Sequence, residues 1–283
     1  MSGNIRSMVS TLRWRLKPIR WAGKWAGTLT QVSRATGQRQ PSVASSPALL
    51  DELRQYGHAK HGEPFDIPQV DIAALAGRAK GAAFADVTTE HPDLVARVFA
   101  NIVNDPVLSN VIDGYFDGDP WLWNVALNYS DPSDTLSDSQ MWHFDYGDVR
   151  QLHFMVYFSD VDETAGPFTF LDAALSDKVV RHPLIIERLT DDDLSQRYDI
   201  EAQSQAIRLT GKRGDVFLND PGRLLHQGAR CAKPRLVMFV SFTTPTPMSK
   251  GGSRTISREM RAKLVEARQA GRAESAIADH VIT

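Results

Sequence analysis

The feature that most constrains this sequence is a series of short strand-like segments between about residues 121 and 245. Turns that contain Gly, Asp, Pro or Ser separate runs rich in aromatic and β-branched residues: WLWNVALNYS, RQLHFMVYFSDV, GPFTFL, AIRLT, GDVFLN and RLVMFVSFTT. No long helical pattern divides these runs, and no G-x-G-x-x-G or P-loop motif occurs. The sequence therefore predicts a mainly β fold with flanking helices (α+β) and a jelly-roll core, not a nucleotide-binding parallel sheet.

Length and cysteine content narrow the class further. At 283 residues the chain is long enough to bury a full hydrophobic core within one large domain. Its single cysteine, Cys231, excludes an internal disulfide framework and fits a reducing compartment. No apolar run approaches the roughly 20 residues that span a bilayer, and the basic N-terminus lacks the apolar stretch of a signal peptide. We therefore expect a cytoplasmic protein.

Charge is distributed unevenly along the chain. Residues 1–40 contain eight basic residues and neither Asp nor Glu, so their formal charge is +8. Because the whole chain has a formal net charge of −2, the remaining residues carry −10. The eight basic residues are Arg6, Arg13, Arg15, Lys17, Arg20, Lys24, Arg34 and Arg39. Nucleic-acid binding needs a basic surface. The acidic remainder therefore predicts that nucleic acid is not a partner.

Residues 1–35 are predicted to form a basic amphipathic arm. Within residues 5–25, apolar side chains recur every three or four positions beside a cationic stripe, and Trp14, Trp21 and Trp25 add aromatic bulk. This pattern is typical of a helix that lies on an anionic membrane surface, which would make the protein peripheral at the inner face of a membrane. A helix packed on the acidic remainder and an organellar transit peptide are the alternatives.

Composition suggests the other boundaries. Residues 36–50 are rich in Ser, Pro and small residues and predict a linker. Residues 51–250 would form the folded domain, and residues 251–283 a C-terminal helical tail. A helical pattern is also present over about 69–80.

Two pairs of histidine and aspartate share the spacing H-x-D. His91 and Asp93 fall at the start of a helix predicted over about 91–104, where Asp93 complements the helix dipole, so this pair is interpreted as structural. His143 and Asp145 run directly into a predicted strand. Residues i and i+2 of a strand project on one face and can chelate one ion. The second pair is therefore the candidate for metal binding.

His226 and Arg235 extend this candidate site. His226 lies 83 residues beyond His143, and two histidines with one carboxylate form a facial triad that leaves iron positions open for dioxygen and a co-substrate. Arg235 opens the strand RLVMFVSF, and an arginine directed into an apolar barrel needs a carboxylate partner. The distal carboxylate of 2-oxoglutarate would suit it, since guanidinium binds carboxylate through two parallel hydrogen bonds. Taken alone, Arg235 would be interpreted as a solvent-exposed arginine of an edge strand.

Over about residues 120–245 the chain resembles the phytanoyl-CoA dioxygenase (PhyH-like) family of Fe(II)/2-oxoglutarate oxygenases. The motifs follow the family's order: WHFD at 142–145, FSDVDETAGPF at 158–168, GDVFL at 214–218, LHQG at 225–228 and PR at 234–235. The resemblance implies a double-stranded β-helix (cupin-like) core, an iron site at His143, Asp145 and His226, and a 2-oxoglutarate anchor at Arg235. It also implies that Asn128 lies near 2-oxoglutarate.

The sequence departs from the family pattern at two places. LDAAL at 171–175 replaces a turn that in the family often reads like P-G-S-H, and Gly228 stands where a serine is common. Both changes would alter the surroundings of the co-substrate and the substrate mouth. Halogenating members of the superfamily replace the metal-binding carboxylate with Gly or Ala, so the retained Asp145 implies hydroxylation.

Other residues near the motifs have less specific signals. On the strand 151–158, Gln151 and His153 share one face, and His153 is interpreted as a hydrogen-bonded strand residue rather than as part of the site. Trp142 and Phe144 are expected to pack around the ligands and exclude water. The polar stretch 176–204 with its acidic run DDD is interpreted as a solvated turn rather than as a lid over the substrate.

Together these features predict an Fe(II)/2-oxoglutarate-dependent dioxygenase. It would use O₂ to hydroxylate a C–H bond of a small molecule, lipid or glycan, and would release succinate and CO₂. The main alternative is a non-redox cupin-like metal- or sugar-binding module, which has no need of a buried receptor for a carboxylate. A zinc hydrolase with the same ligands is a third possibility and would work without O₂.

Overall fold

The computed structural model describes residues 47–133, 138–148, 150–179, 187–228, 230–245, 247 and 256–270. The basic arm, including the predicted membrane-surface helix of residues 5–25, lies outside the described residues. So do residues 36–46 of the expected linker. No described helix is long and apolar enough to cross a membrane.

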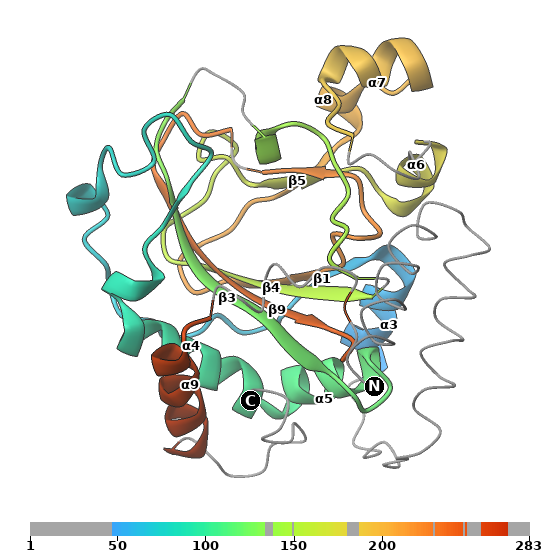
Figure 1. The fold of residues 1–283 in the computed structure, drawn as a ribbon. Coiled ribbons are helices and arrows are strands. Elements are labelled where there is room, and N and C mark those ends of the chain that lie inside the picture. Colours follow the sequence, from blue (N-terminus) through green and yellow to red (C-terminus); the bar gives the residue numbers. More distant parts are fainter. Residues whose placement is uncertain are drawn as a thin grey trace, which may run out of the picture.

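Two antiparallel sheets form the centre of the molecule (Figure 1). The larger has the order β1-β7-β4-β9-β3-β2, with bounds His58–Lys60, Val216–Asn219, Gln151–Tyr157, Arg235–Thr243, Trp121–Ser130 and Ala85–Asp86. The smaller has the order β6-β5-β8, with bounds Ile207–Leu209, Phe168–Phe170 and His226–Gln227. This arrangement confirms the predicted mainly β fold with a jelly-roll core, and a strand lies within each run identified in the sequence.

Helices cover the face of the larger sheet that is turned away from the smaller sheet (Figure 1). They are α3 (Pro47–Tyr56), α4 (Pro92–Asn104), α5 (Pro106–Tyr115) and α9 (Arg258–Ala270). Prolines at the first positions of α4 and α5 suit helix starts, because the missing N–H would have no partner there. The main hydrophobic core lies between these helices and the sheet.

The alternation of side chains along β9 separates this core from the interior of the sandwich. Leu236, Met238 and Val240 belong to the core under the helices. Arg235 and Phe239 instead line a cavity on the side of the smaller sheet. Because successive strand residues point to opposite faces, one strand serves both the core and the cavity.

A third layer packs on the smaller sheet. It contains α6 (Ala173–Lys178), α7 (Asp191–Tyr198) and α8 (Ala202–Gln205), which bury a separate apolar cluster with Trp142 and Phe144. Three short 3-10 helices complete the described elements: Ala73–Leu75, Thr88–Glu90 and Asp138–Gln140.

The structure corrects several expected boundaries. Residues 47–50 of the expected linker are the first turn of α3, and Leu49 and Leu50 pack against the core. The helix expected over 69–80 is only the 3-10 turn Ala73–Leu75 followed by further turns. Gly77 and Gly81 adopt positive φ angles of 82° and 81°, which an α-helix does not tolerate.

Two further interpretations change. The acidic run Asp191–Asp193 is the first turn of α7, capped by the Thr190 side chain, and not a solvated turn. The residues expected to form a C-terminal tail include Ile256, Met260 and Leu264, which belong to the main core. Therefore α9 is an integral part of the domain. Residues 271–283 lie outside the described residues.

Candidate metal centre

A backbone bridge brings His143 and His226 together. The two residues form an isolated antiparallel bridge, in which each N–H donates to the other's carbonyl oxygen at 2.8 and 2.9 Å. His226 is also paired with Phe170 of β5, so the segment around His143 extends the smaller sheet by one position. Strand pairing thus brings together two histidines that lie 83 residues apart in the sequence.

Asp145 completes a three-residue cluster. Its Oδ1 lies 3.6 Å from His143 Nε2 and 3.9 Å from His226 Nε2. One ligand atom from each of the three residues lies within 4.8 Å of the others. Among the described residues this is the one such group of His, Cys, Asp or Glu that could hold a metal ion.

Both imidazoles are prepared to act as ligands through Nε2. Nδ1 of His143 donates to Met141 O at 2.8 Å, and Nδ1 of His226 donates to Leu224 O at 3.0 Å. A carbonyl only accepts, so each proton resides on Nδ1 and each Nε2 has a free lone pair. Burial, together with the neighbouring His226, lowers the pKa of His143 to about 3, and burial lowers the pKa of His226. Both rings are therefore neutral near neutral pH.

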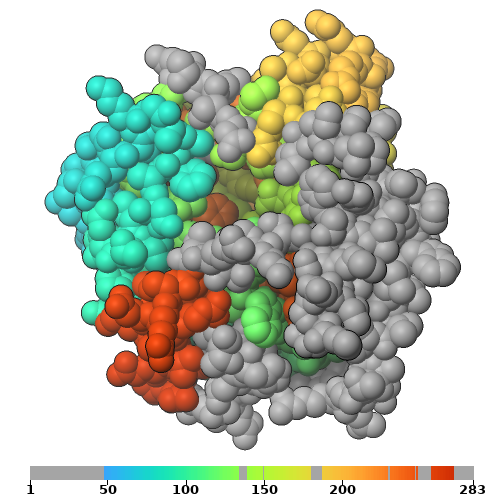
Figure 2. Space-filling model, viewed as in Figure 1, coloured from blue at the N-terminus to red at the C-terminus, as the bar shows by residue number. Residues whose placement is uncertain are grey.

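The cluster lies in a cavity of about 250 Å³ between the two sheets. Its described wall consists of Ala83, Phe84, Trp123, Asn124, Asn128, Ser130, Ser139, His143, Asp145, His153, Phe168, His226, Gly228, Arg235, Phe239 and Ser241. Figure 2 shows this face of the molecule hollowed between the cyan segment on the left and the yellow one at the upper right. Phe168 stacks on the His226 ring with centroids 5.0 Å apart.

Arg235 lines the same cavity and is 5% exposed. Nη1 donates to Gly166 O, whereas the buried Nε has no hydrogen-bond partner among the described residues. No described carboxylate forms an ion pair with it. A buried guanidinium without an anion is costly. Arg235 is therefore a buried cation on the cavity wall without an anionic partner among the described residues, and the solvent-exposed alternative is wrong.

Asn128 and His153 also lie on the cavity wall. Asn128, from β3, faces Val237 in the pairing with β9, and its buried Oδ1 has no hydrogen-bond partner within the described part of the chain. His153 Nε2 lies 2.7 Å from Gln151 Nε2, so His153 is hydrogen-bonded within its strand as expected. It also faces the cavity, which the sequence interpretation did not favour. Burial lowers the pKa of His153 to about 4.

The surroundings of the ligands agree with the expected packing. Trp142 and Phe144 are buried, at 0% and 4% exposure, and do not line the cavity. A Cβ at Gly228 would lie 3.1 Å from Ser139 O, so a larger residue would press on the cavity wall. Sequence reasoning did not identify Trp123, which enters the wall at a register shift of β3 between Leu122 and Asn124.

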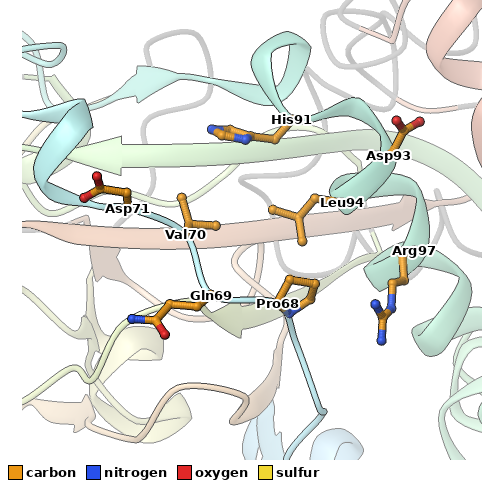
Figure 3. Close-up of a pocket in the computed structure, with 8 residues that line it drawn as sticks. All are labelled: Pro68, Gln69, Val70, Asp71, His91, Asp93, Leu94 and Arg97. Atoms are coloured by element: carbon orange, nitrogen blue, oxygen red, sulfur yellow. The ribbon is translucent and has the colours of Figure 1, made fainter.

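The second H-x-D pair lines a larger groove of about 430 Å³ on the surface, against residues 68–71. Figure 3 shows His91 and Asp93 directed away from each other. Asp93 forms an ion pair with Lys263 of α9. The side chains of His91 and Asp93 are therefore not placed to bind one ion, in agreement with their interpretation as structural.

No family model matches this sequence, and no curated protein matches it. Several solved structures are similar in fold, at low identity. EctD from S. alaskensis, in a structure with 2-oxoglutarate and 5-hydroxyectoine, has 17% identity and a TM-score of 0.47 over 73% of this chain and 79% of its own. SnoK, a non-heme alpha ketoglutarate dependent carbocyclase from nogalamycin biosynthesis, has 14% identity and a TM-score of 0.46 over 78% and 94%. The epimerase SnoN, in complex with Fe3+, alpha ketoglutarate and nogalamycin RO, has 15% identity and a TM-score of 0.42 over 70% and 82%. At these values the function has to be inferred from the cavity itself.

Proposed function

We propose that this protein is an Fe(II)/2-oxoglutarate-dependent dioxygenase. It would hydroxylate a C–H bond of a small molecule, lipid or glycan and release succinate and CO₂. The observation that carries this proposal is the coexistence of two receptors in one cavity: a His–Asp–His cluster and a buried arginine without an anion. Within this class, the motif order favours the phytanoyl-CoA dioxygenase branch.

The residues present fit an iron ion. His143, Asp145 and His226 would hold it through two neutral nitrogen atoms and one anionic oxygen, a set that suits Fe(II) and leaves positions open. When bound, the iron would supply the activation of dioxygen. The protein's own contribution is to fix both imidazole tautomers through the carbonyls of Met141 and Leu224.

The residues also fit 2-oxoglutarate. Arg235 would bind its distal carboxylate, because a guanidinium matches a carboxylate with two parallel hydrogen bonds. Asn128, whose buried amide oxygen has no hydrogen-bond partner among the residues that the structure describes, would contact the co-substrate beside it. A non-redox binding module has no use for this arginine, so Arg235 favours the oxygenase over the cupin-like alternative.

Apolar side chains would protect the reaction from water. Phe168 covers the His226 ring. Phe239 lies on the cavity wall and makes a T-shaped contact with the His153 ring. At the rim, Phe84 is 45% exposed and Trp123 is partly buried, which offers an apolar contact to a substrate. Holding the substrate against the metal and excluding water are the tasks that such a protein performs for its cofactor.

An anaerobic titration with Fe(II) and 2-oxoglutarate tests both receptors at once. The wild-type protein should develop the visible charge-transfer absorption of the iron–2-oxoglutarate chelate and, once O₂ is admitted, release succinate. His143→Ala and Asp145→Ala should abolish both signals, as should EDTA. His91→Ala is the matched control, because it removes the histidine of the other H-x-D pair and should leave both signals unchanged. Full Fe(II)-dependent turnover in Asp145→Ala would refute the assignment.

A further inference from the structure

Gln151 is a fully buried polar residue that contacts the site without belonging to either receptor. It opens β4, and its amide Nε2 lies 3.5 Å from Asp145 Oδ2 and 2.7 Å from His153 Nε2. A carboxylate can only accept hydrogen bonds, so the NH₂ group of the amide must be the end that faces Asp145. The side chain therefore joins the candidate metal ligand to a residue of the cavity wall.

The first consequence concerns the rotation of the Asp145 carboxylate. Oδ1 is the oxygen that faces both histidines, at 3.6 and 3.9 Å from their Nε2 atoms. Gln151 approaches the other oxygen, Oδ2. A donor on Oδ2 favours the orientation in which Oδ1 is directed to the metal, as hydrogen bonds to the outer oxygen of a ligating carboxylate do in other metal sites.

The second consequence concerns His153. When Gln151 donates to Nε2, that nitrogen acts as an acceptor and the imidazole proton resides on Nδ1. His153 lines the cavity, so its remaining ring nitrogen is a hydrogen-bond donor. Apart from Asp145 and Arg235, the described wall carries only apolar, hydroxyl, amide and imidazole groups. His153 thus brings a hydrogen-bond donor to a cavity whose described wall has Asp145 and Arg235 as its ionised side chains.

We propose that Gln151 is a positioning residue with two targets. It turns Asp145 towards the metal, and it fixes the His153 tautomer so that His153 donates to an uncharged oxygen of the substrate, a hydroxyl or carbonyl group. This inference rests on the proposed function, because it takes Asp145 as a metal ligand.

Gly147 provides an independent way to disturb the same amide. A Cβ at this position would lie 2.4 Å from Gln151 Oε1, closer than real Cβ contacts. The φ angle of Gly147 is not positive, so the Gly147→Ala backbone is otherwise unstrained. Gly147→Ala should therefore displace the Gln151 amide without changing a ligand.

Mn(II) affinity, measured by electron paramagnetic resonance without O₂ or substrate, tests the first target. Gln151→Leu fills the position with an apolar side chain and removes the amide, and it should bind Mn(II) about 10- to 100-fold more weakly than wild type. Met155→Leu, on the same face of β4, should bind as wild type does. Gly147→Ala should weaken binding in the wild-type background and have no further effect in Gln151→Ala, because its effect passes through the amide.

The second target is read from the ¹⁵N resonances of the His153 ring in the Zn(II)-loaded protein. Wild type and Met155→Leu should show the proton on Nδ1, and Gln151→Leu should shift the proton toward Nε2. If either the Mn(II) affinity or the tautomer is unchanged in Gln151→Leu, the proposal is overturned while the metal site stands. If Gln151→Leu does not fold, Gly147→Ala is compared with wild type instead, and an unchanged Mn(II) affinity or His153 tautomer in Gly147→Ala overturns the proposal. If wild type binds neither Mn(II) nor Zn(II), the proposed function fails, and this inference fails with it.

Discussion

The side chains of the candidate site differ in how many of their hydrogen-bonding atoms have a partner within the described part of the protein. Each ligating imidazole has its Nδ1 proton bound by a carbonyl, and only Nε2 is left over. Among the described residues, Arg235 has one backbone acceptor, Gly166 O, and its buried Nε has no hydrogen-bond partner. An unpaired buried charge costs free energy, which is why the proposed function assigns an anionic ligand to Arg235.

Arg235→Leu should remove the stabilisation that 2-oxoglutarate gives to the protein. At 100 times its Kd, the co-substrate should stabilise the metal-loaded wild type by about 2.7 kcal/mol. The variant should show little response at the same concentration, although its own unfolding free energy should change little, because leucine removes a buried charge. Thermal melting with and without 2-oxoglutarate measures both. Arg208→Leu, a strand arginine outside the cavity, is the control and should respond as wild type does. An equal response in Arg235→Leu would exclude its role as the anchor.

The sequence identified the residues that carry distinctive chemistry and overlooked those that support them. The convergence of His143, Asp145 and His226 could be predicted from the H-x-D spacing, the distal histidine and the order of the surrounding motifs. Their roles as ligands, and that of Arg235 as an anchor, stay predictions. Gln151 has no such signature, since a strand glutamine is most often a surface residue. Its only signal was the strand alternation, which puts Gln151 on the same face as His153.

At the scale of elements, regular patterns were predicted well and tertiary effects were not. The long strands β3, β4 and β9 coincide with the predicted runs. The two-residue strand β8 forms only because β5 and the His143 segment flank it, and no local pattern specifies such a pairing. The turns near Gly77 depend on Asp131, whose carboxylate accepts hydrogen bonds from the backbone N–H groups of Gly77 and Ala79.

The packing of α9 on α4 leads to a prediction about stability. Leu264 is fully buried in the main core, so Leu264→Ala should lower the free energy of unfolding by about 2–5 kcal/mol. Gln269→Ala, on the exposed side of the same helix, should change it by less than about 0.5 kcal/mol. Urea denaturation measures both variants. If the two variants were equally stable, the packing of α9 on the main core would not contribute to the stability of the domain.

The start of α7 is tied to the core by Asp191. Its carboxylate accepts hydrogen bonds from Trp142 Nε1 and Gln203 Nε2, each at 2.6 Å, and pairs with Arg230 at 3.0 Å. Burial acts to raise the pKa of Asp191, but these hydrogen bonds and the Arg230 charge together hold the pKa below its ordinary value. A depressed carboxyl pKa in the folded state stabilises the protein above the unfolded pKa, and this stabilisation is lost as the pH falls through the folded pKa.

Asp191→Asn should therefore be less stable than wild type at pH 7, and the difference should shrink as the pH falls below about 4. Urea unfolding of both proteins between pH 7 and pH 3 measures the difference. Asp192→Asn, at the exposed neighbouring position, should match wild type throughout. A difference between Asp191→Asn and wild type that stays constant down to pH 3 would mean that the ionised carboxylate does not anchor α7.

At the scale of the whole molecule, the larger sheet separates the main hydrophobic core from the cavity. Helices and the main core occupy one side, and the cavity and the smaller sheet occupy the other (Figure 1). The strand pattern was sufficient to predict the mainly β core with flanking helices, because each strand shows its buried faces in its own alternation. The sequence analysis made no prediction of which face of the larger sheet the helices cover. The substrate was not predictable, because it depends on which side chains from distant segments meet at the cavity mouth.

The basic arm of residues 1–35 predicts that the full-length protein binds to anionic membranes. The full-length protein should sediment with vesicles that contain anionic lipid, less so at high salt, and a variant without residues 1–35 should stay in the supernatant. The shortened variant should still form the iron–2-oxoglutarate chelate. Unchanged sedimentation after the deletion would rule out the membrane-surface helix and favour an arm that packs on the acidic remainder or directs import into an organelle.

The bridge between His143 and His226 has a consequence for how the protein resists unfolding. A metal held by both residues would close a loop of about 80 residues, as a disulfide does in secreted proteins, in a chain whose single cysteine cannot form one. In the chain-entropy model a cross-link of that span opposes unfolding by about 4–5 kcal/mol. Removal of the ion would then lower the free energy of unfolding as well as abolish the proposed activity.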